Sequence, residues 1–454
     1  MKTSIVILTY NQLHYTKLCI DSIRKYTDKN TYELIVIDNH STDGTPQWLK
    51  EQEDIQCILN EKNLGFPKGC NQGIKMATGD NVLLLNNDVI VTPNWLTNLN
   101  KCLYSDEAIG AVGAVTNYCS YYQTIPTHYK NQTEMITFAQ KNNISTPLKW
   151  EERLKLIGFC MLIKKEIVEK VGLLDERFSP GNFEDDDYSL RIKKAGYQLF
   201  LCKDAFIHHF GHTSFHTNNN KFNDLLSINR KKFQEKWGFD GWHKTNIHKH
   251  LIDFINDTPL KKINVLQIGC GCGGTLLQFK NIYKNATLYG IDSNKNALAI
   301  AGTFAHVHHL DIEKKALPYE EEFFDYILLG NILPLLYAPQ KILKNLNVYL
   351  KDNGQIIASI PNIIHYGILK SLLTGNFPQK EDPFLNKIPI HFFTLEKIKH
   401  IFEDSNYIIE AISSLSLQET QEDKNFIQSL CHMVGKNMLQ QYKASQYLVK
   451  AKKL

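Results

Sequence analysis

The stretch LLLNNDVIVTPNWL, residues 83–96, decides how the N-terminal half of this chain folds. Its leucines are typical of a buried strand, yet they run directly into Asn86, Asn87 and Asp88. Two amides and a carboxylate are costly inside an apolar core, so we expect the strand to end here and to present polar side chains. What those side chains do depends on which other strand ends lie beside them.

The composition is that of a globular protein with more than one domain. The chain has 454 residues, of which 43% are hydrophobic and 22% are charged. A chain of this length predicts two or three domains. No run reaches the roughly 18 apolar residues that span a bilayer. The apolar run near the N-terminus is interpreted as a first strand, because no cleavage site for a signal peptide follows it.

Charge and cysteine content restrict the partners and the compartment. The net charge is +4 without a long basic block, so the sequence predicts no binding to nucleic acid. Lysines are spread along the chain, which leaves peripheral membrane association through a weakly basic face as an alternative. Ten cysteines without a signal peptide indicate a reducing compartment. We therefore expect a cytoplasmic protein, with the inner face of the membrane as the alternative.

Strand-like and helix-like segments alternate through both halves of the chain. Runs rich in Val, Ile and Leu, with helical spacing between them, predict parallel sheets covered by helices on both faces. The expected strands are 4–10, 33–39, 56–61 and 81–88 in the first half, then 263–268, 287–294, 324–331, 354–362, 407–414 and 445–453. The predicted fold class is α/β, with an N-terminal domain over 1–235, a linker over 236–260 and a C-terminal domain over 261–454.

The expected strand ends of the first half share a polar character. Ligands of open α/β sheets bind at the carboxyl ends of the strands. The residues at or just after these ends are Thr9, Tyr10, Asn11, Asp38, Asn63, Gly65, Asn87 and Asp88. One such group is ordinary in a turn, but four groups in succession at one edge of a sheet indicate a binding site.

Several motifs of the first half occur in an order found in one enzyme family. They are VILTYN, VIDNHSTDGT, NLGFPKGCNQG, LLLNNDV, GLLDERF, FEDDDYSLR and IHHFGHTS. From residue 3 to about residue 215 the chain resembles the family 2 glycosyltransferases of GT-A fold. The resemblance implies transfer of a sugar from a nucleotide-sugar donor to a glycan or glycoconjugate acceptor, with inversion at the anomeric carbon.

By this resemblance Asp88 is expected to hold a divalent cation, Mg²⁺ or Mn²⁺, at the diphosphate of the donor. The family often has an acid where this chain has Asn86, so one carboxylate remains. A histidine adds a metal ligand in the family, which points to His209 in preference to His208. His212 is expected to have a structural or acceptor-side role.

The resemblance also assigns the nucleotide pocket. Asp38 would accept the imide N–H of uracil or thymine, which favours a UDP- or dTDP-sugar. Thr9, Tyr10 and Asn71 would line the base and ribose pocket. The whole nucleotide-sugar site is predicted to consist of Thr9, Tyr10, Asn11, Asp38, Asn63, Gly65, Asn71, Asn87 and Asp88.

Residues 184–187 are four consecutive acids before a helical segment. One interpretation is the first turn of a helix, where carboxylates gain from the helix dipole. The functional interpretation needs one acid that faces the acceptor hydroxyl and removes its proton. The acidic pair of the family implies that Asp185 is this base, with Glu184 or Asp187 positioning it.

The second half begins with a strand and a glycine-rich turn, VLQIGCGCGG. Gly269, Gly271 and Gly273 let a ligand approach the backbone at the start of a helix. Asp292 ends the next strand, where a carboxylate typically binds the ribose of an adenosine cofactor. NAD and S-adenosylmethionine both fit this pattern. Asp311, expected at the adenine amine, and the terminal SQYLVKAKK, expected as a last antiparallel strand, favour S-adenosylmethionine.

This half resembles the class I S-adenosylmethionine-dependent methyltransferases, which have a Rossmann-like fold. SIPNIIHYGILKSLLTGNF and IHFFTLEKI resemble a subgroup found in polysaccharide gene clusters. The resemblance adds Asn331 to the cofactor site, whereas Gln267 departs from the acid usual before the glycine turn. His365 and His391 are candidate bases for transfer to a hydroxyl, and each has a structural interpretation as its alternative.

The leading hypothesis is a bifunctional enzyme that transfers a sugar and then methylates the product at a sugar hydroxyl. A second hypothesis makes the C-terminal half a non-catalytic module that binds S-adenosylmethionine or acts as a scaffold. A third makes it a nicotinamide oxidoreductase.

Overall fold

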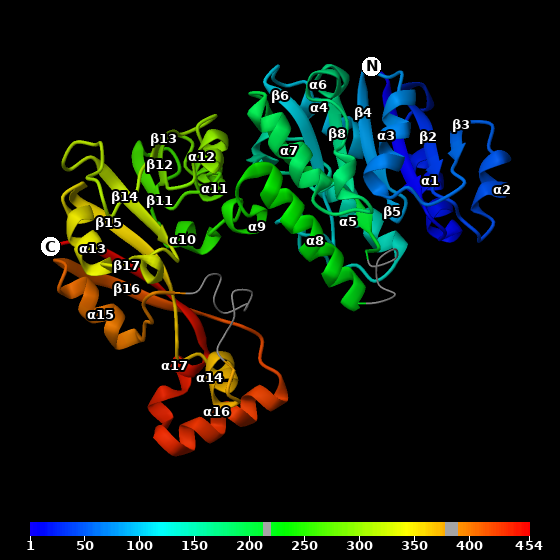
Figure 1. Ribbon diagram of the computed structural model, residues 1–454. Coiled ribbons are helices and arrows are strands. Elements are labelled where there is room, and N and C mark those ends of the chain that lie inside the picture. The colour runs from blue at the N-terminus through cyan, green and yellow to red at the C-terminus, as the bar shows by residue number, and fades with distance from the viewer. Residues whose placement is uncertain (212–218, 377–388) are drawn as a thin grey trace. The chain divides into compact units, whose positions relative to one another are not determined.

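The computed structural model describes residues 1–211, 219–376 and 389–454. Two compact units make up the chain, Met1–Gly241 and Trp242–Leu454. Each unit is an α/β structure with its own sheet (Figure 1).

The first unit alternates strands and helices, as the sequence predicts. Its strands are β1 (Thr3–Thr9), β2 (Tyr32–Asp38), β3 (Ile55–Leu59), β4 (Asn81–Asn86), β5 (Val89–Ile90), β6 (Ile109–Val115), β7 (Trp150–Arg153), β8 (Cys160–Lys164), β9 (Gln198–Phe206) and β10 (His208–His209). Its helices are α1 (Leu13–Tyr26), α2 (Thr45–Lys50), α3 (Phe66–Met76), α4 (Trp95–Leu103), α5 (Gln132–Asn142), α6 (Lys165–Val171), α7 (Glu184–Lys194) and α8 (Asn219–Trp237).

The main sheet of this unit has the strand order β3-β2-β1-β4-β8-β6-β9-β7. The first four strands are parallel, as predicted, but β8 and β7 run antiparallel to their neighbours. The strand order reverses between β1 and β4, so a crevice forms where their carboxyl ends diverge. A separate two-stranded ribbon pairs β5 with β10.

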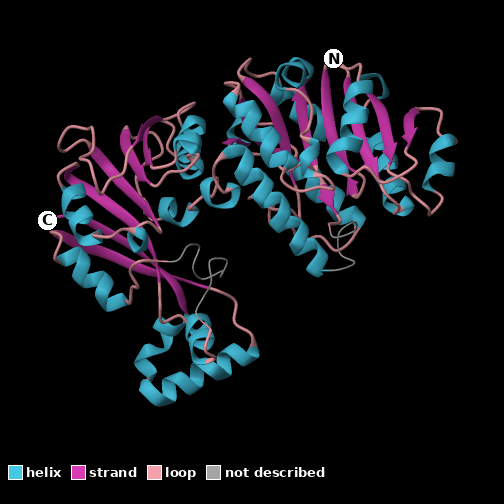
Figure 2. Ribbon diagram, in the orientation of Figure 1, coloured by secondary structure: helices cyan, strands magenta, loops and turns pink. Residues whose placement is uncertain are grey.

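Alternating side chains of the central strands fill two cores. Ile5 and Ile7 of β1 face α1 and α4, whereas Val6 faces α3, α6 and α7. Figure 2 shows helices on both faces of the strands. Gly73 allows α3 to approach β1 closely, because a Cβ there would lie 2.4 Å from the Val6 side chain. Each fully buried Ile or Val contributes about 1.5–3 kcal/mol to folding.

The second unit has a seven-stranded sheet. Its strands are β11 (Ile263–Ile268), β12 (Ala286–Asp292), β13 (His306–His309), β14 (Phe324–Gly330), β15 (Leu350–Pro361), β16 (Tyr407–Ser416) and β17 (Ala444–Lys453). Its helices are α10 (Lys249–Asp253), α11 (Gly274–Ile282), α12 (Lys295–Ala301), α13 (Pro339–Asn347), α14 (Tyr366–Leu373), α15 (Leu395–Glu403), α16 (Gln421–Val434) and α17 (Leu439–Lys443), and α9 (Gly241–Lys244) lies at the boundary of the units.

The strand order of this sheet is β13-β12-β11-β14-β15-β17-β16. β17 runs antiparallel to both β15 and β16, so the antiparallel final strand predicted from SQYLVKAKK is confirmed. Order reverses between β11 and β14, which places the second crevice after Ile268 and Gly330.

Residues 242–260 pack into the second unit, which differs from the linker predicted for 236–260. Leu251, Ile252 and Ile255 are buried against strand β11 and helix α11. The hydroxyl of Tyr283 donates to the carbonyl of Ile255 at 2.8 Å. Although this segment is rich in Asn, Lys and His, its apolar side chains lie on one helical face, and their burial attaches the segment to the second unit.

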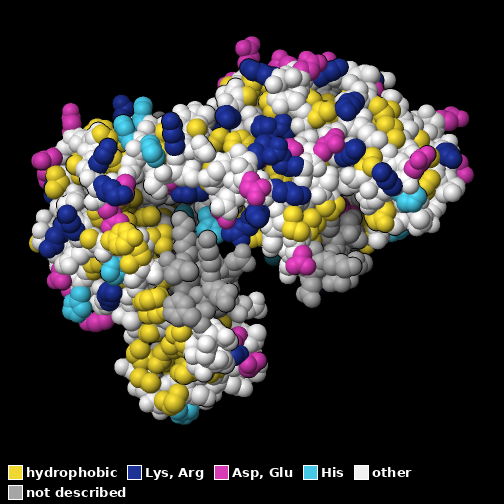
Figure 3. All heavy atoms as spheres, in the orientation of Figure 1, with side chains coloured by type: hydrophobic (Ala, Val, Ile, Leu, Met, Phe, Trp, Pro, Cys, Tyr) yellow, Lys and Arg dark blue, Asp and Glu magenta, His cyan; other side chains and the backbone are white. Residues whose placement is uncertain are grey.

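Within the described residues, no helix is both long and apolar enough to cross a membrane. Hydrophobic side chains nevertheless gather on the surface of α14, α16 and α17 (Figure 3). Leu373, Met433 and Val434 are 69%, 72% and 64% exposed.

Candidate active sites

A cavity of about 610 Å³ lies at the carboxyl ends of the central strands of the first unit. Eight of the residues that the sequence predicts for the site line it together: Tyr10, Asn63, Gly65, Asn87, Asp88, Glu184, Asp185 and His209. It is also lined by residues that the sequence did not single out, among them Tyr118, Gly158, Phe159 and Asn182.

The ribbon of β5 and β10 brings Asp88 and His209 together. His209 pairs with Val89 across the ribbon, and Phe210 donates its backbone N–H to the carbonyl of Asp88 at 3.0 Å. The Nε2 atom of His209 consequently lies 3.2 Å from Oδ1 of Asp88. Asn86, at the end of β4, places its Nδ2 3.5 Å from the same His209 nitrogen.

Residues 117 and 118 hold His209 in a defined orientation. The amide of Asn117 accepts from the backbone N–H of His209 at 2.8 Å and donates to its carbonyl at 3.1 Å. The His209 Nδ1 lies 2.9 Å from the carbonyl of Tyr118, while Nε2 faces Asp88. Both nitrogens therefore face acceptor oxygens, which favours the doubly protonated ring, and a cation at Nε2 would take the place of one proton. Burial lowers the pKa of His209, but Asp88 outweighs burial and the net shift is upward.

His208 points elsewhere. Its Nδ1 lies 2.6 Å from the hydroxyl of Tyr129, and burial lowers its pKa to about 4. It does not line the cavity, because neighbouring residues of a strand project to opposite faces. The geometry therefore favours His209 over His208 as a ligand. His212 lies outside the described residues.

Asp88 and His209 fit two ligands of one divalent cation. Mg²⁺ binds at roughly 2.1 Å in octahedral geometry, which places adjacent ligands about 3 Å apart. The 3.2 Å between Oδ1 and Nε2 agrees with that spacing. Among the residues that the structure describes, no group of three or more His, Cys, Asp or Glu is arranged around one metal position. Substrate oxygens and water would have to complete the coordination.

Asp38 ends β2 directly beside Thr9 at the end of β1. It is almost fully buried, and its Oδ2 accepts from the backbone N–H of Ser41 at 3.0 Å. Its Oδ1 has no hydrogen-bond partner in the described part of the chain. A buried acceptor without a partner fits a ligand N–H, although Asp38 is not part of the cavity lining.

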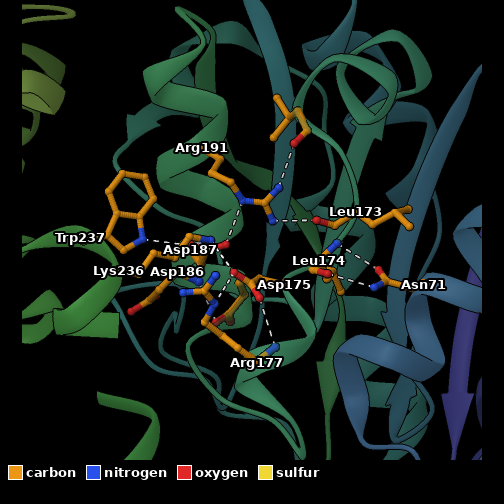
Figure 4. Close-up of polar contacts among 12 residues, drawn as sticks. Asn71, Leu173, Leu174, Asp175, Arg177, Asp186, Asp187, Arg191, Lys236 and Trp237 are labelled. Carbon is orange, nitrogen blue, oxygen red and sulfur yellow. Dashed lines mark hydrogen bonds and ion pairs between the residues drawn. The ribbon is translucent and has the colours of Figure 1, made fainter. Parts of the chain in front are cut away.

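Three other predicted nucleotide residues have structural partners. Thr9 is buried and its hydroxyl lies 2.9 Å from that of Thr16. The side chain of Asn11 accepts from the N–H of Thr42 at 2.8 Å. Asn71 does not line the cavity: on α3 it donates to the carbonyl of Leu174 and accepts from the N–H of the same residue (Figure 4). Asn71 therefore ties α3 to the loop before α7.

Asp187 also has a structural environment, which differs from the positioning role predicted for it. Its side chain is fully buried and forms ion pairs with Arg191 and Lys236 (Figure 4). The indole N–H of Trp237 donates to its Oδ1 at 2.9 Å. Lys236 also pairs with Asp175 at 2.7 Å, so this network joins α7, α8 and the loop before α7.

Asp185 lies at the cavity in the first turn of α7. Its Oδ2 accepts from the N–H of Gly158 at 3.0 Å, and its Oδ1 accepts from the N–H of Asp186 at 2.9 Å. Burial, followed by the charge of Asp186, raises the pKa of Asp185 to about 6. Asp186 itself turns away to pair with Lys155 at 2.7 Å. A carboxylate with a pKa near the working pH is suited to general-base chemistry.

The second unit has its own cavity, of about 330 Å³, at the crevice between β11 and β14. Gly269 and Asn331 line it. Gly269, Gly271 and Gly273 all have positive φ, so the turn after β11 has the backbone form that glycine permits. Gln267 Oε1 and Asn331 Oδ1 are buried without a hydrogen-bond partner among the described residues. These unsatisfied acceptors fit a ligand with N–H donors, such as the ammonium of a methionine moiety.

Asp292 lies at the end of β12, as predicted, but Lys244 occupies it. The Lys244 Nζ lies 2.7 Å from both carboxylate oxygens. Oδ2 also accepts from the N–H of Gly271 and Oδ1 from that of Asn294, each at 2.8 Å. A ribose diol could bind Asp292 only after Lys244 moved away.

The segment that carries Lys244 lies against the glycine turn. The backbone carbonyl of Lys244 accepts from the N–H of Cys272 at 2.7 Å. A Cβ on Gly271 would lie 2.5 Å from that carbonyl oxygen. His248 packs against Gly330 and lines the cavity, and burial lowers its pKa to about 4. Composition had suggested only a linker here.

The structure does not bring the remaining predicted residues of this half to the cavity. Asp311 is exposed, and its carboxylate pairs with Lys314 at 2.8 Å. The His365 ring is buried, and its Nδ1 accepts from the N–H of Gly367 at the start of α14. The His391 Nε2 lies 3.0 Å from the carbonyl of Tyr337. Neither histidine is among the residues that line this cavity.

Two α/β units, each with a polar crevice where its strand order reverses, define a two-domain protein of the nucleotide- and cofactor-binding α/β class. Residues 4–172 match the family model "Glycosyl transferase family 2", and residues 247–440 match "Methionine biosynthesis protein MetW". The chain joins a family 2 glycosyltransferase domain of GT-A-like fold to a Rossmann-like, methyltransferase-like domain.

Curated relatives match the first half. A glycosyltransferase, GlyG, from Streptococcus pneumoniae is 25% identical over 45% of this chain and 67% of its own length. The O-antigen biosynthesis protein RfbC of Myxococcus xanthus is 26% identical over 46% of this chain and 17% of its own length. The chain spans less than two thirds of the length of the first curated relatives it matches.

Solved structures are similar to each half at low identity. A mannosyltransferase from Pyrobaculum calidifontis, solved with GDP-Man and Mn²⁺, covers 52% of this chain and 64% of its own, with 19% identity and a TM-score of 0.39. An S-adenosylmethionine-dependent methyltransferase from Mesorhizobium loti covers 45% of this chain and 96% of its own, with 15% identity and a TM-score of 0.33.

Proposed function

We propose that the first unit transfers a sugar from a UDP- or dTDP-sugar to a hydroxyl of a glycan or glycoconjugate, with inversion and with the help of a divalent cation. The observation that carries the proposal is one cavity lined both by the Asp88–His209 pair and by Asp185. The family match over residues 4–172 supports the reaction class.

The residues of the chain have separate roles in this reaction. Asp88 and His209 would hold a divalent cation, which when bound neutralises charge on the departing diphosphate. Asp185 accepts the proton of the acceptor hydroxyl. The acceptor oxygen forms its bond to the anomeric carbon as the bond from that carbon to the diphosphate oxygen breaks, and the electron pair leaves with the diphosphate. Attack from the face opposite the leaving group inverts the anomeric carbon.

The choice of nucleotide rests on Asp38. A carboxylate oxygen without a partner, buried at the end of β2, suits the imide N–H of uracil or thymine. Guanine carries an imide-like N–H together with an amino group and would engage both carboxylate oxygens, whereas Oδ2 of Asp38 already accepts from the N–H of Ser41. A UDP- or dTDP-sugar is therefore proposed.

We propose that the second unit binds S-adenosylmethionine and transfers a methyl group, with a hydroxyl of the glycosylated product as acceptor. Gly269, Gln267 and Asn331 would hold the methionine half, and Asp292 the ribose once Lys244 has moved. The bound cofactor would supply a methyl group on a sulfonium. His248 is the buried imidazole beside the cavity, and its lowered pKa keeps it neutral and able to accept a proton.

The alternative of a non-catalytic C-terminal module is favoured by one observation. The ion pair between Lys244 and Asp292 occupies the ribose carboxylate. Calorimetry that shows no binding of S-adenosylhomocysteine would support a scaffold, and binding without methyl transfer to the glycosylated product would support a non-catalytic binding module.

The setting is proposed as polysaccharide biosynthesis in the cytoplasm. One relative carries the name O-antigen biosynthesis protein. Peripheral contact with the inner face of a membrane is proposed through the exposed apolar side chains Leu373, Met433 and Val434. Flotation with anionic vesicles, compared between the wild type and the triple serine variant, tests that contact.

A thermal-shift screen tests the whole proposal. UDP-, dTDP- and GDP-sugars are added with Mn²⁺, and S-adenosylmethionine is added separately. We expect stabilisation by a uridine or thymidine donor that requires Mn²⁺ and is lost in Asp88→Asn. Stabilisation by GDP-sugars alone, or equal stabilisation of wild type and Asp88→Asn, would contradict the donor assignment.

A further inference from the structure

Two buried polar groups at the start of α7 have no role in the chemistry described above. Glu184 is 6% exposed, and its Oε2 has no hydrogen-bond partner in the described part of the chain. The side-chain Nδ2 of Asn182 is likewise buried without a partner in that part. Both residues line the 610 Å³ cavity. Leaving a buried polar atom unpaired is costly, so each is expected to find a partner in a ligand.

The backbone around these residues is held in an unusual form. Asn182 and Phe183 both have left-handed φ values, 74° and 75°. Such residues cost energy and persist only where the surroundings impose them. Phe183 is buried against Phe233 of α8, with ring centroids 5.6 Å apart. The packing of Phe183 against Phe233 therefore holds this backbone, and with it Asn182 and Glu184, at the cavity wall.

A single side chain from α8 fixes the same loop. The Nδ2 of Asn229 donates to the carbonyls of Phe178, Gly181 and Asn182, at 2.7, 2.9 and 3.3 Å. The loop thus has its shape before a ligand arrives. A preformed pair of unsatisfied groups is what a specific hydrogen-bonding site requires.

The reaction geometry decides which part of the donor meets this pair. The anomeric carbon must lie between the leaving diphosphate, at Asp88 and His209, and the base Asp185. Glu184 is next to Asp185 and lines the same cavity. The sugar ring is the part of the donor that occupies this region.

We propose that Glu184 and Asn182 bind a hydroxyl of the transferred sugar and so select donors that carry that hydroxyl over deoxy sugars. Asn182 donates from its amide, and Glu184 acts as a neutral carboxyl that can both donate and accept. Burial raises the pKa of Glu184 well above its ordinary value, which agrees with a neutral side chain. This role replaces the positioning role that the sequence suggested for Glu184. It rests on the proposed sugar transfer.

The test is a cycle of variants and donor analogues in the full-length protein. Binding of UDP-glucose, UDP-galactose, their dTDP counterparts and their monodeoxy analogues is measured by calorimetry with Mn²⁺, alongside UDP and dTDP alone. We expect Glu184→Ala to weaken binding of the best donor about tenfold, while binding of the free nucleotide changes little. One monodeoxy analogue should bind the wild type about tenfold more weakly than its parent and lose nothing further in Glu184→Ala.

Controls separate the outcomes. Asn182→Ala should weaken binding of the parent donor and leave binding of the same monodeoxy analogue unchanged. Glu184→Gln should lose less donor affinity than Glu184→Ala. Glu169→Gln, at an exposed acid of α6, should bind the donor as the wild type does. Equal loss for all donors and for the free nucleotide would overturn the inference and make Glu184 structural. Loss of transfer in Glu184→Gln as complete as in Asp185→Asn would also overturn it, since Glu184 would then be the base. Failure of the wild type to bind any nucleotide would instead refute the proposed function.

Discussion

Both carboxylate oxygens of Asp292 lie 2.7 Å from the Nζ of Lys244. Lys244 precedes β11 in the chain, and Asp292 is the last residue of β12. Asp292 is therefore neutralised by the chain itself, at the position where an adenosine cofactor would place its ribose. Binding of a ribose at Asp292 would have to displace Lys244.

Lys244→Met should consequently raise affinity for S-adenosylhomocysteine. Without the lysine, Asp292 is freed for the ribose, and a hydrogen bond to a charged group is worth about 1.5–3 kcal/mol, or about tenfold or more. Calorimetry on the variant and on Lys249→Met, a change at an exposed lysine of α10, measures this. Weaker binding by Lys244→Met would show that the lysine contacts the cofactor instead.

Asp88→Asn and His209→Ala should both lose Mn²⁺ binding, seen by electron paramagnetic resonance of the free ion. Removing either one leaves a single protein ligand at the site. His208→Ala is the matched control, because its ring bonds with Tyr129 and does not line the cavity. Equal loss in His208→Ala and His209→Ala would mean that the ribbon, and not the ligand, was disturbed.

Asn117→Ala should weaken Mn²⁺ binding without removing a ligand. Asn117 bonds both the N–H and the carbonyl of His209, and loss of such an outer partner typically costs about 10–100-fold in metal affinity. Metal titration gives the affinity, and thermal unfolding shows whether the domain remains folded. A variant that folds normally and binds Mn²⁺ as well as the wild type would contradict the role.

The rate of sugar transfer should rise with pH through about 6, the raised pKa of Asp185. Below that pH the carboxyl is protonated and cannot accept the hydroxyl proton, so the acidic limb follows this group. Asp186→Asn removes a charge that raises this pKa and should move the limb to lower pH. The pH profile of kcat/KM at saturating metal measures both, and a limb displaced upward would exclude Asp185 as the base. Asp185→Asn should retain donor binding and lose transfer by about 10²–10⁴-fold.

Asp187→Ala should destabilise the first unit by about 3 kcal/mol. The change leaves Arg191 and Lys236 without their shared carboxylate and Trp237 without its acceptor. Denaturant unfolding of the variant measures the loss. A change below about 0.5 kcal/mol would place the residue among ordinary surface positions.

The sequence was sufficient for the central strands, such as β1 to β4, because these are runs rich in Val, Ile and Leu. It did not predict the antiparallel direction of β7 and β8 or the polar strand β13. Polar residues at the carboxyl ends of neighbouring parallel strands lie at one edge of the sheet, so the sequence alone indicates that Asn87 and Asp88 belong to a site. The choice between His208 and His209 could not be derived in this way. It depends on the pairing of His209 with Val89, a contact between residues 120 positions apart.

Two kinds of residue misled the sequence interpretation. Asn71 and Asp187 are polar residues on the inner faces of helices, where a structural hydrogen bond and a ligand contact have the same sequence pattern. Lys244 lies in a segment whose composition is that of a linker, and only packing of Leu251 and Ile252 shows that it belongs to the second unit. Nothing in the sequence assigned Asn117 to the site, because it contacts the backbone atoms of His209 and such contacts leave no residue pattern.

The amide of Asn229 has a consequence for engineering. The family match ends at residue 172, yet the proposed base Asp185, the histidine beside Asp88 and the loop held by Asn229 all follow it. Consider a chimera in which only the segment equivalent to residues 1–172 comes from a relative. It would retain this chain's loop before α7. A chimera that exchanges the loop without α8 would lose the hydrogen bonds from Asn229 that hold the loop. To transfer donor preference between relatives, the segment from Phe178 to Trp237 should therefore be exchanged as a whole.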